Sequence, residues 1–226
     1  MRGGCRRSSP HSGPRAVAGW LMAGLVLLCL ALGLTVVAAG EGTVPGDTAI
    51  ARALQLPVSP EIDAIARFAS MVGDDFPSMV ILALIGVALL AYLERRDLAL
   101  FLGIAAAMRA IGPVLKILVA SPRPTIEAVV VVTEAGGLGF PSGHAMGAAL
   151  FYGAIAVIAP QVVANCFVVR AIQVAAVAMM ILIALSRVRL GVHWPTDIAG
   201  GLLYGLAIVC LLQAAMVTWR TSQLKK

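Results

Sequence analysis

The sequence has few charged residues and few aromatic ones. Of its 226 residues, 12% are charged and 5% are aromatic, whereas 60% are hydrophobic. A soluble domain has to cover its surface and carries about twice that charged fraction, so we do not expect a soluble protein. The net charge is +6, but there is no basic stripe with interleaved aromatics, which argues against nucleic-acid binding.

Cysteine is scarce as well. The four cysteines form no CxxC pair and no ligand spacing with histidine; they are Cys5, Cys29, Cys166 and Cys210. We interpret them as small apolar side chains and expect neither a disulfide framework nor a zinc site. We expect no metal site and no cofactor, and the lack of a carboxylate cluster suited to a divalent metal is consistent with this expectation.

The hydrophobic residues occur in blocks that approach or reach the roughly 20 residues needed to span a bilayer. We predict an all-α protein, a single integral-membrane bundle of six transmembrane helices over residues 1–226, with its motif-bearing core at 98–218. The predicted spans are 16–39, 77–92, 98–119, 144–160, 168–186 and 196–218. The first block exceeds the apolar region of a signal peptide, about 7–15 residues, so we expect a retained helix rather than a cleaved signal.

Lysine and arginine in the short loops set the orientation of a membrane protein. With six spans, one side carries most of the basic residues: Arg2, Arg6, Arg7, Arg15, Arg95, Arg96, Arg170, Arg220, Lys225 and Lys226. The other side carries the acidic residues Glu41, Asp47, Glu61, Asp63, Asp74 and Asp75. We therefore expect both termini, with the tail 1–15, in the cytoplasm of a plasma (inner) membrane protein, and segment 41–76 on the extracytoplasmic (periplasmic) side. Within that segment, residues 47–71 are too polar to span and form either an interfacial helix or a flexible loop.

Three polar clusters fall at span ends on the predicted external side. They are Lys116 with Arg123-Pro124, then Pro141-Ser142-Gly143-His144, then Ser186-Arg187 with His193 and Asp197. Because the helices end at one depth of the bilayer, we expect the clusters to meet. Lys116, Arg123 and Arg187 supply positive charge that suits a phosphate, and Ser142 and Gly143 open a helix whose free N–H groups favour an anion.

Two of the three histidines lie in these clusters. An imidazole can attack phosphorus and form a phosphohistidine that water later hydrolyses. It needs its other ring nitrogen held by an acceptor, and Asp197, four residues after His193, can reach back for this purpose. His144 then remains to protonate the departing alkoxide.

Two further arginines lie near the clusters and are left outside the predicted site. Arg109, inside the third span, is expected to support the site from beneath or to pair internally, because lipid exposure of a charge is costly. Arg189 is expected to face lipid headgroups, the substrate or solvent.

The three clusters resemble the motif of the type 2 phosphatidic acid phosphatase superfamily, which also contains the vanadium haloperoxidases. That pattern reads K-x6-R-P, P-S-G-H and S-R-x5-H-x3-D, and each position is matched here. The resemblance covers about residues 116–205 and implies a helical bundle, no need for magnesium and inhibition by vanadate. It implies these roles: His193 as nucleophile, Asp197 as its partner, His144 as acid, and Lys116, Arg123, Ser142, Gly143 and Arg187 as phosphate-binding residues.

The expected activity is metal-independent hydrolysis of a phosphomonoester or diphosphate of a membrane lipid, with the lipid and the bilayer as the expected partners. The resemblance suggests undecaprenyl diphosphate, phosphatidylglycerol phosphate, phosphatidic acid or a lipid A phosphate, with a preference for an isoprenyl diphosphate or a phospholipid phosphate. One alternative is a phosphotransferase that uses the same site. A second is a vanadium-dependent haloperoxidase, although such relatives are soluble. A non-enzymatic lipid-binding protein is disfavoured because His193, His144 and Asp197 are all present.

Overall fold

The computed structural model describes residues 13–39, 43–73 and 78–223, and these ranges contain helices and no strands. The all-α prediction is therefore confirmed for this part of the chain. The α-helices are α1 Pro14–Ala38, α2 Asp47–Leu54, α3 Pro60–Val72, α4 Val80–Tyr92, α5 Arg96–Ala107, α6 Ile111–Val119, α7 Gly143–Val162, α8 Cys166–Arg189 and α9 Pro195–Gln223. Some residues used above lie outside the described ranges, namely Arg2, Cys5, Arg6, Arg7, Glu41, Asp74, Asp75, Lys225 and Lys226.

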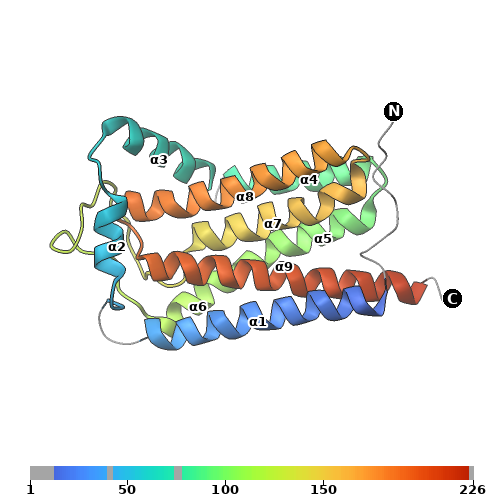
Figure 1. Ribbon diagram of the computed structural model, residues 1–226, viewed down its shortest axis with the longest axis horizontal. Coiled ribbons are helices and arrows are strands. Elements are labelled where there is room, and N and C mark those ends of the chain that lie inside the picture. Colours follow the sequence, from blue (N-terminus) through green and yellow to red (C-terminus); the bar gives the residue numbers. More distant parts are fainter. Residues whose placement is uncertain (1–12, 40–42, 74–77, 224–226) are drawn as a thin grey trace.

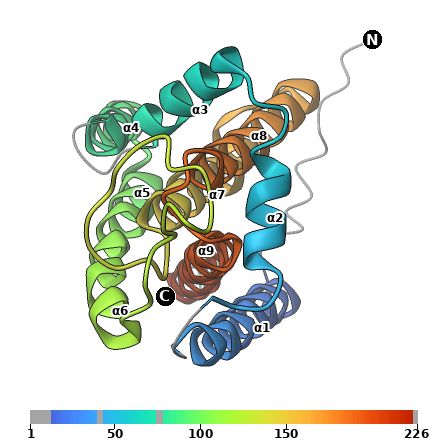
Figure 2. The same cartoon turned by 90° about the vertical axis from the view of Figure 1, so that its left-hand side faces the viewer.

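The long helices run side by side along the longest axis of the molecule (Figure 1). Helix α7 lies between α8 and α9, and α1 packs along α9. Helix α1 begins and α9 ends at the same end of the bundle, while α2, α3 and the loop 120–142 gather at the opposite end (Figures 1 and 2). The predicted site residues of the loops therefore lie at the end of the bundle away from the start of α1.

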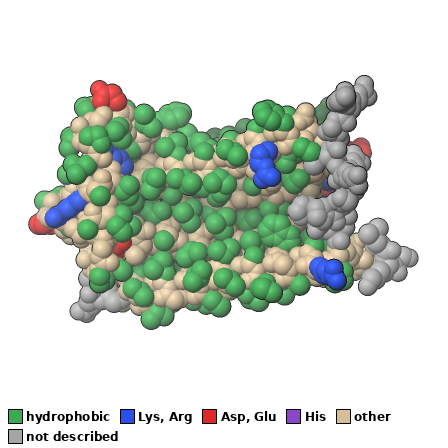
Figure 3. Space-filling model, viewed as in Figure 1, with side chains coloured by type: hydrophobic (Ala, Val, Ile, Leu, Met, Phe, Trp, Pro, Cys, Tyr) green, Lys and Arg blue, Asp and Glu red, His purple; other side chains and the backbone are tan. Residues whose placement is uncertain are grey.

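Five helical segments of the described chain are long and apolar enough to cross a membrane: Pro14–Ala38, Arg96–Val119, Gly143–Val162, Cys166–Arg189 and Pro195–Gln223. On the face shown in Figure 3, hydrophobic side chains cover the middle of the molecule and charged side chains gather towards its two ends. This distribution fits a bilayer around the middle of the bundle, because burying a charge in lipid is costly. The chain is a multi-pass membrane protein.

The predicted span 77–92 differs from the others. The helix observed there, α4, has only 13 residues, and at 1.5 Å per residue it covers about 20 Å of a hydrocarbon core about 30 Å thick. The exact count of six transmembrane helices is therefore not confirmed by helix length. The other predicted spans agree with the observed helices to within a few residues at most ends.

The third predicted span is interrupted. A turn of 3₁₀ helix at Met108–Ala110 separates α5 from α6. Pro113 lies in the first turn of α6, and a proline ring clashes with the carbonyl four residues before it, here that of Arg109. The break places Arg109 at a local change of helix geometry, close to the first turn of α7.

Helices α7 and α9 approach each other closely at two glycines of α9. A Cβ atom on Gly201 would lie 2.6 Å from the carbonyl oxygen of Ser142, and one on Gly205 would lie 2.5 Å from the Cβ of Ala149. Small residues allow membrane helices to pack this tightly. The close packing brings the start of α7, with the second polar cluster, against the first turns of α9, with Asp197 of the third cluster.

The segment between α1 and α4 contains two short helices, α2 and α3, so the helical interpretation of residues 47–71 is confirmed over the flexible loop. Cys166 differs from the expectation of no disulfide framework, because it is disulfide-bonded. Cys29 and Cys210 are free.

Candidate active site

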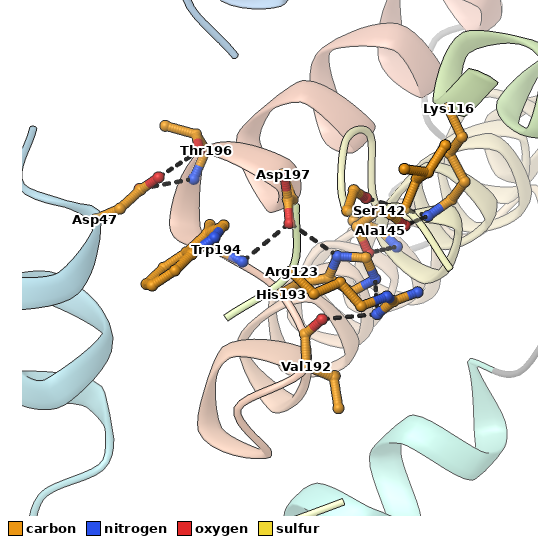
Figure 4. A network of polar contacts seen from close by, with 12 residues as sticks. Asp47, Lys116, Arg123, Ser142, Ala145, Val192, His193, Trp194, Thr196 and Asp197 are labelled. Atoms are coloured by element: carbon orange, nitrogen blue, oxygen red, sulfur yellow. Dashed lines mark hydrogen bonds and ion pairs between the residues drawn. The ribbon is translucent and has the colours of Figure 1, made fainter. Parts of the chain in front are cut away.

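The structure brings the three polar clusters together at one end of the bundle (Figure 4). Lys116 lies in the last turn of α6, and Arg123 lies in the loop that follows. Ser142 is the N-cap of α7, and His193 lies in the short turn between α8 and α9. Residues far apart in the sequence thus meet because their helices all end at this level.

His193 and Asp197 form a buried pair. The Nδ1 atom of His193 lies 3.0 Å from Oδ2 of Asp197. Helix α9 begins at Pro195, so Asp197 is in its first turn and its carboxylate turns back over the helix start. The same Oδ2 accepts a hydrogen bond of 3.0 Å from the backbone N–H of Trp194, which fixes the carboxylate from a second direction.

Arg123 contacts the other side of the same imidazole. Its Nη1 lies 3.4 Å from Nε2 of His193 and donates a hydrogen bond of 2.7 Å to the carbonyl of Val192. A guanidinium has only donors, so the Nε2 atom that faces it has to be the unprotonated nitrogen. The two neighbours together select the tautomer with a proton on Nδ1, donated to Asp197, and a lone pair on Nε2.

Burial and charge act on the imidazole in the same direction. Burial, reinforced by the positive charges of Arg123, Lys116 and Arg187, holds the pKa of His193 well below its usual range. A lowered pKa keeps the ring neutral, which is the form with a free lone pair. The site therefore keeps His193 neutral rather than cationic.

Lys116 is anchored to the loop that carries Pro141. Its Nζ donates to the carbonyls of Leu138, at 2.7 Å, and Gly139, at 3.1 Å. An ammonium has three N–H donors, so one remains for a ligand. Lys116 thus holds the loop in place and also brings a positive charge to the site.

Ser142 acts through the backbone as well as the side chain. Its N–H donates a hydrogen bond of 2.9 Å to the carbonyl of Asp197, and its fully buried hydroxyl accepts from the N–H of Ala145 at 3.5 Å. The hydroxyl therefore caps α7. The first turn of α7, which starts at Gly143, offers the positive end of a helix dipole to an anion.

His144 and Arg187 complete the set. His144, the second residue of α7, is half-buried, and the charges of Arg187, Arg109, Arg123 and Lys116 all reach it. Arg187 is buried in the last turn of α8 and donates from Nη1 to the hydroxyl of Ser70 in α3. The eight predicted site residues thus lie around one centre, and their roles remain predictions.

The two arginines left outside the predicted site both have defined contacts. Arg109 donates to the carbonyl of Gly143 at 3.4 Å, which agrees with support of the site from beneath. The expectation that Arg189 faces solvent or lipid headgroups is wrong. It is buried, pairs with Asp63 of α3 at 2.7 Å and donates to the carbonyl of Pro57 at 3.0 Å.

Sequence reasoning missed the polar residues of α2 and its flanks. Both carboxylate oxygens of Asp47 accept from Thr196, one from its N–H at 3.1 Å and one from its hydroxyl at 2.6 Å. Gln55 exchanges two hydrogen bonds with the backbone of Val130, at 2.6 and 3.1 Å. Both partners are more than 70 positions away, so no local sequence pattern could have indicated these contacts.

Within the described residues, no group of three or more histidine, cysteine, aspartate and glutamate side chains is placed to hold a metal ion. The polar centre is cationic instead: Lys116, Arg123 and Arg187 all act electrostatically on His193. Such a centre is suited to an anionic group with several oxygens.

The chain is similar to known proteins in both sequence and fold. Residues 97–221 match the model of the PAP2 superfamily. The chain is 28% identical over 177 residues to phosphatidylglycerophosphatase B of Bacillus subtilis (strain 168), covering 74% of this chain and 81% of that protein. It also resembles the crystal structure of a transmembrane PAP2-type phosphatidylglycerolphosphate phosphatase from Bacillus subtilis, with a TM-score of 0.71 and 26% identity over 90% of this chain and 98% of the other. The family match spans more than half of the chain and all three polar clusters, and the protein therefore belongs to the PAP2 superfamily.

Proposed function

We propose that the protein is a lipid phosphate phosphatase that needs no metal ion and works through a phosphohistidine at His193. The observation that carries the proposal is the placement of one neutral imidazole between Asp197, at 3.0 Å from Nδ1, and Arg123, at 3.4 Å from Nε2. A nucleophile needs its lone pair aimed and its other nitrogen held. A cation beside the attacking nitrogen also draws the phosphoryl group to it.

The proposed reaction has two displacement steps. In the first, Nε2 of His193 attacks phosphorus, the P–N bond forms and the bond from phosphorus to the lipid oxygen breaks. His144 gives its proton to that oxygen, and Asp197 stabilises the imidazolium. In the second, a water loses a proton to His144 and attacks phosphorus, and the P–N bond breaks to release inorganic phosphate and neutral His193.

The remaining predicted site residues bind the phosphoryl oxygens in this proposal. Lys116, Arg123 and Arg187 neutralise their charge, and the N–H groups at Gly143 add the helix dipole. The hydroxyl of Ser142 accepts from Ala145 and keeps its O–H to donate to a phosphoryl oxygen, while its backbone N–H holds the start of α7 against Asp197.

For the substrate, we propose phosphatidylglycerol phosphate as the first lipid to test, because the names of both relatives contain it. Phosphatidic acid, undecaprenyl diphosphate and lipid A phosphates offer the same phosphoryl chemistry. A lipid substrate is further supported by an apolar cavity of about 260 Å³ between α4, α5 and α7, with Arg109 and Gly147 in its wall. Such a cavity can accept part of a hydrocarbon chain.

We also propose six crossings, with α4 as the short one, and both termini in the cytoplasm of the plasma (inner) membrane. An even number is supported by α1 beginning and α9 ending at the same end of the bundle (Figure 1). Arg95, Arg170 and Arg220 then lie on the cytoplasmic side, which puts His193 on the extracytoplasmic side.

The test is phosphate release by the purified protein in detergent, over a panel of the four lipid classes, with and without EDTA. We expect activity on at least one lipid that EDTA does not abolish and that vanadate inhibits. His193→Ala should abolish turnover, whereas His11→Ala, in the predicted cytoplasmic tail, should not. A strict requirement for magnesium would refute the metal-free mechanism, and turnover that survives His193→Ala would refute the nucleophile.

A further inference from the structure

Helix α3 lies close to the candidate site, although its residues precede the region that matches the family model. It covers residues Pro60–Val72, whereas the match begins at residue 97. It lies along the end of α8 near the candidate site (Figure 2). The chain therefore places a helix that the shared family region does not include directly beside the end of α8 that carries Arg187.

Small residues form the face of α3 that meets α8. Ala66, Ala69 and Ser70 are its buried residues. Just beyond its end, a Cβ atom on Gly73 would lie 2.4 Å from a methyl carbon of Ile183. The spacing of three, four and seven residues puts all four on one stripe of the helix. A stripe of this kind lets the α3 backbone come close enough for a short side chain to reach α8.

The one hydroxyl on this stripe contacts Arg187. The Ser70 hydroxyl accepts a hydrogen bond from Nη1 of Arg187, and both side chains are buried. The position of Ser70 is held at the other end of the helix, where Asp63 pairs with Arg189 at 2.7 Å and Ser59 caps the first turn. The acceptor that Arg187 meets is thus carried by a docked helix.

We propose that Ser70 is a positioning residue that holds the guanidinium of Arg187 in its phosphate-binding orientation. This inference rests on the proposed function. An arginine side chain has many rotamers, and the entropy lost when binding restricts them weakens binding unless the side chain is ordered beforehand. Ser70 orders one N–H of Arg187 in the free protein, so less rotamer freedom is lost when the guanidinium binds a phosphoryl group. Helix α3 thereby takes part in binding through a residue outside the shared motif.

The experiment compares Ser70→Ala, which removes the acceptor without adding bulk, with Ser70→Thr, which keeps the hydroxyl. We expect Ser70→Ala to raise the KM for phosphatidylglycerol phosphate and the inhibition constant of vanadate about tenfold, the effect of losing one hydrogen bond to a charged group. The kcat should change by less than about twofold, and Ser70→Thr should restore both constants. Ser222→Ala, the same change at an exposed serine in the last turn of α9, is the matched control and should leave both constants unchanged.

A double-mutant cycle that combines Ser70→Ala with Arg187→Lys tests whether Ser70 acts through Arg187. Vanadate binding is measured by calorimetry, which needs no turnover. If the proposal is correct, Ser70→Ala has no further effect once Arg187 is replaced. Additive effects, or a wild-type vanadate affinity in Ser70→Ala, would overturn it. If the unmodified protein hydrolyses no lipid, the proposed function fails instead, so the two failures are distinguishable.

Discussion

At the scale of single residues, the chemistry of the site depends on what touches each side of one imidazole ring. Asp197 accepts from Nδ1, and Arg123 faces Nε2. Both neighbours are needed, because Asp197 holds the proton on Nδ1 and Arg123 keeps Nε2 unprotonated. Three substitutions test this arrangement separately.

Asp197→Asn should reduce kcat about 10³- to 10⁴-fold, by analogy with the same change beside the histidine of a serine protease triad. The amide can donate to Nδ1 and thereby favour the tautomer with the proton on Nε2, the wrong nitrogen for attack. Steady-state phosphate release measures the effect, and the melting temperature in detergent checks that the variant folds. A loss below tenfold would contradict the assigned tautomer.

On the acid side of the pH profile, the fall in kcat/KM should occur below about pH 6.5, the ordinary pKa of a histidine side chain. Because the pKa of His193 is lowered by burial and by Arg123, the neutral nucleophile persists to lower pH. Arg123→Gln removes one cation, which raises this pKa and should move the acid limb to higher pH. A pH–rate profile measures the shift, with Arg170→Gln, at the start of α8, as the control; an unmoved limb would argue against the electrostatic effect.

Gly139→Ala should lower activity by at least tenfold. A Cβ at Gly139 would lie 2.9 Å from Oδ2 of Asp197 and 3.1 Å from the carbonyl of Pro122, so the carboxylate has to shift, and small misplacements of catalytic groups are costly. Gly136→Ala is the matched control in the same loop, since a Cβ there meets nothing within 4 Å. Equal activity of the two variants would mean that the loop adapts freely.

At the scale of elements, helices α2 and α3 do more than connect α1 to α4. Helix α2 supplies Asp47 as an acceptor for the first turn of α9, and α3 supplies Asp63 for Arg189. The N-terminal N–H groups of a helix have no partners within it, so α9 obtains part of its cap from a distant segment. The start of α9 is also where Asp197 lies, which links this cap to the site.

Asp47→Ala should therefore lower the stability of the protein. Removing a cap acceptor costs about 1–2 kcal/mol, and a loss of this size lowers the melting temperature of a protein of this length by a few degrees. Asp47→Asn, which keeps one acceptor oxygen, should lose less. Thermal unfolding in detergent measures the difference, and identical melting temperatures for all three proteins would show that the contact contributes nothing to stability.

At the scale of the whole molecule, the number of crossings depends on α4. Helix α4 is 13 residues long, which is shorter than a typical span. Helices α1 and α9 nevertheless lie antiparallel (Figure 1), as an even number of crossings requires. Reporter fusions after Gly73, Arg95 and Lys226 test the proposal. With six crossings, the first is extracytoplasmic and the other two are cytoplasmic. Fusions after Gly73 and Arg95 that report the same side would mean that α4 does not cross.

The composition and the three motif clusters determined the helical class, the membrane location and the family, because hydrophobic blocks and fixed motif spacings are local properties of the chain. They also predicted that Lys116, Arg123 and His193 would meet, since helix ends at one level of a bilayer are neighbours. Only the tertiary structure decided which ring nitrogen of His193 faces Arg123, that Arg189 pairs with Asp63, and that Ser70 reaches Arg187. These contacts join residues 70 to 126 positions apart. The side chains involved have no periodic pattern, so their pairing follows from how the helices pack and not from any segment alone.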